Sequence, residues 1–241
     1  MNKVILMLVE GPSDEDALCG PTAMAISNML VKSDCFYTDV TTANLFSNQA
    51  SFEVFSNVEN TVQRFVESHI EKNQGYDWKD LAAVVHVVDL DGALVSPSAV
   101  VEDHDASGIV YGSDTIKTPY RDFVLKRNRE KRNSLAKLCQ KETLGKGRKK
   151  VPYRIYFMSR NLEHALYGAS GDLDDKQKER LSIAFSQACA NCPGLFLETL
   201  RNEEIAVKGN YEESWKAMFK GTNSLHRGSN YHLLFEDIER F

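Results

Sequence analysis

The chain has 241 residues, of which 42% are hydrophobic and 26% are charged, and its formal net charge is −5. This length can bury a full hydrophobic core and lies near the upper end for one domain, so we expect a single domain over residues 1–241. The apolar runs are far shorter than the roughly 20 residues of a membrane-spanning helix, and no leader with a cleavage site precedes the first run, so we expect a soluble cytoplasmic protein without a membrane partner.

Apolar runs alternate with amphipathic segments along the first half of the chain. Short continuous apolar runs predict buried strands, whereas apolar residues three and four positions apart predict helices. The expected strands cover residues 3–9, 52–55 and 82–88. The expected helices run from residue 14 to about 31, capped by Ser13 or Asp14, and from about 57 to 70. This order predicts an α/β fold with a mostly parallel, Rossmann-like sheet and helices on both faces.

A long segment, residues 93–152, separates the third expected strand from the next one at residues 154–158. Residues 120–139 within it have helical spacing and a heavily charged middle, so we expect a basic helical insertion. Further helices are expected at residues 162–167, 174–189 and 211–219, the last two within a helical C-terminal extension of about 170–241. Residues 230–235 fit either a strand or the start of a final helix.

Carboxylates follow two of the predicted strands. The first strand runs into Glu10-Gly-Pro-Ser-Asp14, and the later one runs into Asp89-Leu-Asp91. Because the C-terminal ends of parallel strands lie along one edge of a sheet, we expect Glu10, Asp89 and Asp91 to converge. Clustered carboxylates repel one another unless a cation lies among them, and oxygen ligands suit Mg²⁺ or Mn²⁺. The sequence therefore predicts a divalent-metal enzyme.

The order of these motifs resembles the Toprim domain of topoisomerases, bacterial primases and OLD-family nucleases. That domain has a glutamate after its first strand and an Asp-x-Asp after a later strand, positions that Glu10, Asp89 and Asp91 occupy here. Asp14 falls where OLD-like members often have a further acidic residue. The resemblance implies a Toprim fold in which these four carboxylates bind the metal.

A third stretch, residues 155–163, is similar to the OLD-family strand that ends in serine before a glutamate on the next helix. It implies Glu163 as a further catalytic metal ligand. The resemblance also implies a cation near the leaving group, for which Lys208, Lys117 and Arg160 are candidates. Ser159 fits a group that orients a phosphate or a water, and it fits an ordinary strand-end hydroxyl equally well.

The resemblance implies a Mg²⁺- or Mn²⁺-dependent nuclease that hydrolyses phosphodiester bonds in DNA or RNA, tRNA included, with Glu10 as ligand, proton carrier or both. A Walker-type phosphate-binding motif is absent from the sequence, and so are the additional regions of topoisomerases and primases. We therefore expect a stand-alone Toprim nuclease. Such proteins commonly act as toxin-like or anti-phage (antiviral) defence effectors with a separate partner, often an ATPase, and a second copy of the chain is a further candidate partner.

Residues 86–94 also resemble the first motif of haloacid dehalogenase-like phosphatases. In that motif the first Asp, here Asp89, is the nucleophile and the second, Asp91, is the acid/base. The motif normally lies near the N-terminus, whereas here a complete strand-helix-strand-helix block is expected before it. A non-catalytic binding module is a third hypothesis, which the three intact acids disfavour. The phosphatase remains the main alternative to the nuclease.

Lysine and arginine are concentrated in one segment of an otherwise acidic chain. Residues 117–154 hold 14 Lys or Arg and three Asp or Glu, a balance of +11 against −16 for the remainder. This segregation favours contact with the phosphates of a polyanion over a merely solvated helix and loop. The expected nucleic-acid contacts are Lys126, Arg127, Arg129, Lys131, Arg132, Lys146, Arg148, Lys149 and Lys150.

The five cysteines are scattered and odd in number, which suits reduced thiols better than a disulfide framework. Cys189-Ala-Asn-Cys192 has no second CxxC pair, so we expect ordinary cysteines near a helix end. The six histidines form no metal-binding pattern. His86 lies inside an apolar run, and we expect a hydrogen-bonded core residue.

Overall fold

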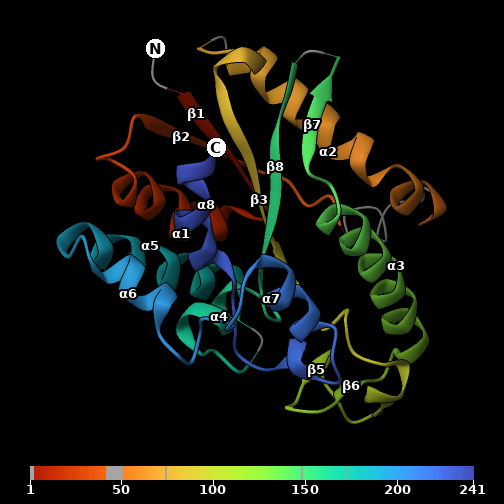
Figure 1. Ribbon diagram of the computed structural model, residues 1–241. Coiled ribbons are helices and arrows are strands. Elements are labelled where there is room, and N and C mark those ends of the chain that lie inside the picture. The colour runs from red at the N-terminus through yellow and green to blue at the C-terminus, as the bar shows by residue number, and fades with distance from the viewer. Residues whose placement is uncertain (1–2, 42–50, 74, 148, 172) are drawn as a thin grey trace.

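The computed structural model of the chain describes residues 3–41, 51–73, 75–147, 149–171 and 173–241. Its main sheet has five strands in the order β2-β1-β3-β8-β7 (Figure 1). These strands are β1 (Lys3–Val9), β2 (Val31–Tyr37), β3 (Leu81–Asp89), β7 (Thr143–Lys146) and β8 (Lys149–Met158). Neighbours run parallel except β7, which pairs antiparallel with β8. The predicted α/β fold with a mostly parallel sheet is confirmed.

Helices cover both faces of this sheet, because its central strands are apolar on both sides. Along β1, Ile5 and Met7 belong to one core cluster and Leu6 and Leu8 to another, as the alternation of side chains along a strand requires. The first cluster includes residues of α1 (Pro12–Ala25), α4 (Leu162–Tyr167), α5 (Asp175–Asn191), α6 (Leu195–Arg201) and α8 (Leu234–Asp237). The second includes residues of α2 (Ser51–Asn73), α3 (Arg121–Cys139) and α7 (Tyr211–Met218).

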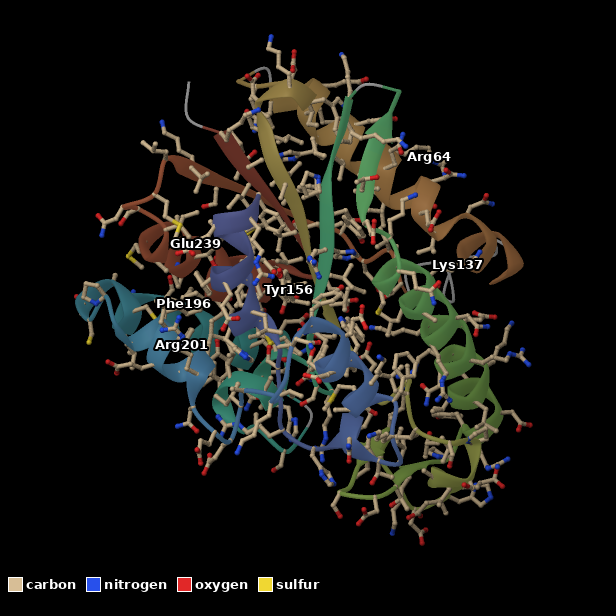
Figure 2. All side chains as sticks on the ribbon, viewed as in Figure 1. Arg64, Lys137, Tyr156, Phe196, Arg201 and Glu239 are labelled. Carbon is tan, nitrogen blue, oxygen red and sulfur yellow. A yellow bond between two sulfur atoms is a disulfide. The ribbon has the colours of Figure 1, made fainter. Side chains whose placement is uncertain are left out.

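Polar side chains inside the two clusters are hydrogen-bonded to distant elements. Tyr156 of β8 lies in the interior, and its hydroxyl donates to Asp237 of α8 at 2.7 Å. Figure 2 shows this buried tyrosine and, for comparison, the exposed Arg64 on α2. His86 of β3 is fully buried, and its Nδ1 lies 2.9 Å from the Tyr153 hydroxyl, which confirms the predicted core histidine.

The segment between β3 and β8 is more than a basic helix. It contains a second, three-stranded sheet of β4 (Val100–Glu102), β6 (Ile116–Thr118) and β5 (Val110–Tyr111), in that order. This small sheet has its own hydrophobic cluster, in which Ile116 packs with Val124 of α3. The predicted helix is confirmed as α3, while β7 and the first residues of β8 also fall within the expected insertion.

Several expected elements differ from the structure. Residues 52–55, expected as a strand, belong to α2, and the helix expected to reach residue 31 ends at Ala25. The edge strand β2 was not expected because its sequence, Val-Lys-Ser-Asp-Cys-Phe-Tyr, has no continuous apolar run. Residues 231–235 are helical, and α6 is additional. The short 3-10 helices are Trp78–Asp80, Pro97–Ala99, Asn223–Leu225, Tyr231–Leu233 and Ile238–Arg240.

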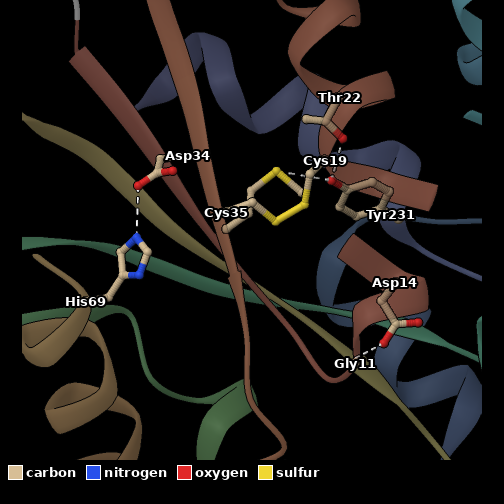
Figure 3. Close-up of a disulfide and its surroundings, with 9 residues drawn as sticks. Gly11, Asp14, Cys19, Thr22, Asp34, Cys35, His69 and Tyr231 are labelled. Atoms are coloured by element: carbon tan, nitrogen blue, oxygen red, sulfur yellow. Dashed lines mark hydrogen bonds and ion pairs between the residues drawn. A yellow bond between two sulfur atoms is a disulfide. The ribbon is translucent and has the colours of Figure 1, made fainter. Parts of the chain in front are cut away.

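A disulfide joins Cys19 of α1 to Cys35 of β2, with 6.1 Å between their Cα atoms (Figure 3). The expectation of five reduced thiols is therefore wrong for this pair, because the α1-β2 connection brings two cysteines of different elements together. Cys139, Cys189 and Cys192 are free, and the last two lie near the end of α5 as expected. In the described part of the chain, no helix combines the length and the apolar character needed to cross a membrane.

Candidate functional site

The parallel pairing of β1 with β3 brings the two acidic motifs to one edge of the main sheet. Glu10 directly follows β1, and Asp89 is the last residue of β3. The turn after β3 is tied to the turn after β8, because the Asp91 amide donates to the Arg160 carbonyl at 2.7 Å. Asp91 has a φ of 48°, and Gly92 has a φ of 65°. A Cβ on Gly92 would approach Ile116 Cδ1 to 2.6 Å, so this turn requires the glycine.

A buried lysine of α3 lies between the acids of the two strands. Lys131 is fully buried, and its Nζ lies 2.5 Å from Asp91 Oδ2 and 3.3 Å from Glu10 Oε2. The Glu10 and Asp91 side chains are 11% and 28% exposed. A buried ammonium is stable only when it is paired, and here two carboxylates from different strands provide the pairing. Lys131 therefore connects the basic helix to the motifs after β1 and β3.

Glu10, Asp14, Asp89 and Asp91, called the acid cluster below, are close enough to influence one another's ionisation. Burial raises the pKa of Glu10 to about 8, with Asp39 and Asp91 adding to the rise and Lys131 opposing it. Burial, with the charges of Asp14 and Glu10, holds the pKa of Asp89 well above its ordinary range. Both shifts run toward the protonated carboxyl, and a cation bound at the cluster would oppose them.

Asp91 and Lys131 form the charged part of the site. Burial would raise the pKa of Asp91, but the Lys131 and Arg127 cations outweigh it and hold that pKa below its ordinary value. Burial would lower the pKa of Lys131, but Asp91 and Glu10 outweigh it and hold that pKa above its ordinary value. An ionised Asp91 next to a protonated Lys131 is the stable arrangement of this pair.

Asp14 of the acid cluster has a further acidic neighbour, Glu163. Asp14 lies in the first turn of α1, where its Oδ2 accepts a hydrogen bond from the Gly11 amide at 2.8 Å (Figure 3). Burial and the neighbouring Glu163 raise the pKa of Asp14 to about 7, although the Gly11 hydrogen bond opposes this. Glu163 of α4 is buried, and its Oε1 lies 3.9 Å from Lys178 Nζ of α5.

Two further residues beside Glu10, Thr41 and Asp39, could not be identified without β2. Thr41, which follows that strand, donates its hydroxyl to Glu10 Oε1 at 2.8 Å, and its amide donates to Asp39 Oδ1 at 2.9 Å. Asp39 lies two residues after β2, as Glu10 lies after β1, but the sequence pattern did not identify β2 as a strand. Arg127 was expected as a nucleic-acid contact, and its link to the acid cluster was not foreseen: its Nη2 donates to the Asp91 carbonyl at 2.7 Å.

Among the described residues, no ion pair joins the three predicted leaving-group cations to the acid cluster. Lys208 is exposed, and within the described ranges no hydrogen bond or ion pair joins it to the acid cluster. Lys117 Nζ lies 3.4 Å from Asp103 Oδ2 at the small sheet. The Arg160 guanidinium donates to the carbonyls of Leu225 and Gly112. Lys131, by contrast, forms ion pairs with Glu10 and Asp91 of the cluster.

The nine expected nucleic-acid contacts lie on α3 and at residues 146–150, and the described ones differ in how exposed they are. Arg127 and Lys131 are buried on the inner face of the helix, where both contact Asp91. Lys126 and Arg129 are exposed on α3, and Lys149 and Lys150 are exposed on β8. Arg132 is half-buried, and its Cζ lies 5.6 Å from the centre of the Phe219 ring. Arg148 and the Lys146 side chain lie outside the described residues.

The carboxylate oxygens of the acid cluster are ligands of the kind that Mg²⁺ and Mn²⁺ prefer, although the Lys131 ammonium lies among them. In the described part of the chain, no group of three or more His, Cys, Asp or Glu side chains is arranged to hold a metal ion. The raised pKa values of Glu10, Asp14 and Asp89 nevertheless reflect carboxylates that a cation would stabilise. Ser159, one residue beyond the β8 partner of Asp89, has a buried hydroxyl without a hydrogen-bond partner among the described residues.

Comparisons with protein-family models, with curated proteins and with solved structures found no match to the chain.

Proposed function

We propose that the protein is a divalent-metal-dependent nuclease with a Toprim-like active site that hydrolyses phosphodiester bonds. One observation carries the proposal: Glu10 and Asp91, which follow different parallel strands, both form ion pairs with the buried Lys131 at the edge where Asp89 also lies. An ordinary surface turn has no need of a buried lysine. A centre that handles a phosphodiester needs both acids and a cation.

In this proposal the side chains have distinct tasks. Glu10, Asp89 and Asp91 would hold Mg²⁺ or Mn²⁺, with Asp14 and Glu163 beside them, and such an ion would supply Lewis-acid polarisation of the scissile phosphate. Lys131 places a fixed positive charge where negative charge develops on the reacting phosphate. Glu10, whose pKa is raised to about 8, can take up or release a proton near neutral pH.

Binding of the nucleic acid would rely on the exposed cations next to this centre. Lys126 and Arg129 lie one helical turn apart on the outer side of the helix that carries Lys131 on its inner side. Contacts of this kind attract the phosphate backbone without reading its sequence. The resemblance to stand-alone Toprim nucleases further suggests a toxin-like or defence effector that works with a partner such as an ATPase.

The position of Glu10 favours the nuclease over the phosphatase. A haloacid dehalogenase-like enzyme uses the two aspartates of its first motif and gives a glutamate on the neighbouring strand no chemical task. Here Glu10 and Asp91 share one lysine. A shared cation makes Glu10 part of the same centre, which a metal-dependent nuclease requires.

The test is Mg²⁺-dependent cleavage of duplex DNA, single-stranded DNA and tRNA, assayed side by side. Glu10→Gln, Asp89→Asn and Asp91→Asn should each abolish cleavage while circular dichroism stays native. Glu203→Gln, at an exposed position away from the acid cluster, is the matched control and should retain full activity. Full activity in two of the three cluster variants, or no metal-dependent cleavage by the wild-type protein, would contradict the proposal.

A further inference from the structure

A cavity of about 320 Å³ lies beside the acid cluster, between the small sheet and the start of α4. We call it the side cavity. The residues used below are Ile109 and Tyr111 from the small-sheet segment, and Arg160, Asn161, His164 and Ser170 from the segment after β8. Its volume lies at the lower end of the range for small-molecule sites.

Two walls of the side cavity are bonded directly to Asp91. The Tyr111 hydroxyl donates to the Asp91 carbonyl at 3.2 Å, and the Asp91 amide donates to the Arg160 carbonyl at 2.7 Å. The Arg127 guanidinium, which also contacts the Asp91 carbonyl, lies 3.3 Å from the Tyr111 hydroxyl. A group in the cavity would therefore adjoin a group held at the acid cluster.

The lining combines the planar side-chain groups of Tyr111, Arg160, Asn161 and His164 with apolar residues such as Ile109. The Arg160 guanidinium lies 5.8 Å from the centre of the Tyr111 ring, and two backbone carbonyls hold it in place. The imidazole of His164 also lines the cavity, and its Nδ1 lies 3.4 Å from the Ser159 carbonyl. The Asn161 Oδ1 accepts from the His164 amide at 2.9 Å, which leaves the Asn161 amide group as a donor.

These features match an unpaired nucleobase better than a bare phosphate. Bases stack on aromatic rings and on guanidinium planes, and their edges hydrogen-bond with neutral amides and imidazoles. Arg160 already donates to two carbonyls, so it provides less for an anion than a free arginine would. The described lining residues include no carboxylate, in contrast to the adjacent acid cluster.

We propose that the side cavity binds one unpaired nucleoside unit of the nucleic acid, next to the phosphate that the acid cluster handles. This inference rests on the proposed nuclease function and adds to it a substrate class. A base can enter the cavity only when it is not paired, so single strands, loops or flipped nucleotides are the substrates. Duplexes without unpaired bases would be cleaved poorly.

The test uses saturation-transfer NMR on the full chain in EDTA, with AMP, CMP, GMP, UMP and inorganic phosphate as probes. We expect saturation of the base protons and weak binding of at least one nucleotide. Ser170→Trp, at an exposed rim position, should abolish this binding by filling the cavity. His164→Ala should weaken it about tenfold, as expected for one lost hydrogen bond.

His104→Ala, in an exposed loop outside the cavity, is the control and should bind as the wild type does. Three results would overturn the proposal: no saturation of base protons, equal competition by inorganic phosphate alone, or undiminished binding in Ser170→Trp. Because the measurement uses neither metal nor cleavage, its failure is distinguishable from failure of the nuclease assay.

Discussion

Lys131 Nζ lies 2.5 Å from Asp91 Oδ2, and this contact joins the inner face of α3 to the turn that follows β3. The Asp-Leu-Asp motif and the basic helix are therefore parts of one centre. The same ammonium lies 3.3 Å from Glu10 Oε2, so three segments far apart in the sequence meet at a single cation.

Removing the lysine charge should destabilise the protein more than removing a surface charge. Lys131→Met leaves two buried carboxylates without their cation, and we expect a loss of about 3 kcal/mol in the free energy of unfolding, near the lower end for broken buried pairs because Asp91 is 28% exposed. Urea denaturation measures this loss. Lys126→Met, on the exposed side of the same helix, should change stability by less than about 0.5 kcal/mol. Equal effects of the two substitutions would contradict the central role of Lys131.

The stability of the metal-free protein should fall as the pH rises through the neutral range. Burial raises the pKa of Glu10 from 4.5 to about 8, so the folded state binds a proton that the unfolded state has released. For a raised carboxyl pKa, the stabilisation is complete below the unfolded value and is lost as the pH approaches the folded value. Urea unfolding in EDTA at several pH values between 5 and 8.5, for the wild type and Glu10→Gln, isolates this contribution. Parallel pH profiles for the two proteins would show that Glu10 is not the titrating group.

Added Mg²⁺ should raise the melting temperature at pH 8, because a cation bound to the folded state alone stabilises it by mass action. The gain is about 2.7 kcal/mol at a metal concentration of 100 times Kd. Asp89→Asn should show a much smaller shift, since Asp89 is a proposed ligand. Asp105→Asn, in an exposed loop, should shift as the wild type does. A shift of the same size in Asp89→Asn would place the metal elsewhere.

Neutralising the exposed face of α3 should weaken nucleic-acid binding and flatten its dependence on salt. Each phosphate contact contributes roughly 0.7 to 0.9 to the slope of log affinity against log salt, so Lys126→Gln with Arg129→Gln should reduce the slope by about 1.5. Fluorescence anisotropy with a labelled oligonucleotide measures both quantities. Lys176→Gln with Arg180→Gln, exposed on α5, is the control. An unchanged slope in the α3 variant would mean that its exposed cations bind something other than nucleic acid.

The elements that follow from the sequence are those with a strong local pattern. The apolar runs of β1 and β3 identify central strands, and the spacing within α3 and α4 identifies those helices. Parallel pairing then places Glu10 and Asp89 at one edge without further information. The strand β2 could not be identified because a half-buried edge strand needs no apolar run.

The role of Lys131 could not be predicted either. Lys131 is one cation among many in its segment. The face of α3 that packs on the sheet decides whether its side chain points inward or outward. Thr41 depends on β2 in the same way, since its contact with Glu10 requires a strand that the local pattern hides. These contacts are tertiary, so they become visible only when the helix and the edge strand are in place.

The most direct measurement compares two substrates in two variants under one Mg²⁺ condition: a labelled single-stranded polynucleotide and a small phosphomonoester. We predict polynucleotide cleavage by the wild type that is lost in both Glu10→Gln and Asp89→Asn, with negligible monoester turnover by any of the three proteins. Robust monoester turnover that survives Glu10→Gln but is lost in Asp89→Asn would contradict this account and would identify a phosphatase that uses Asp89 as its nucleophile.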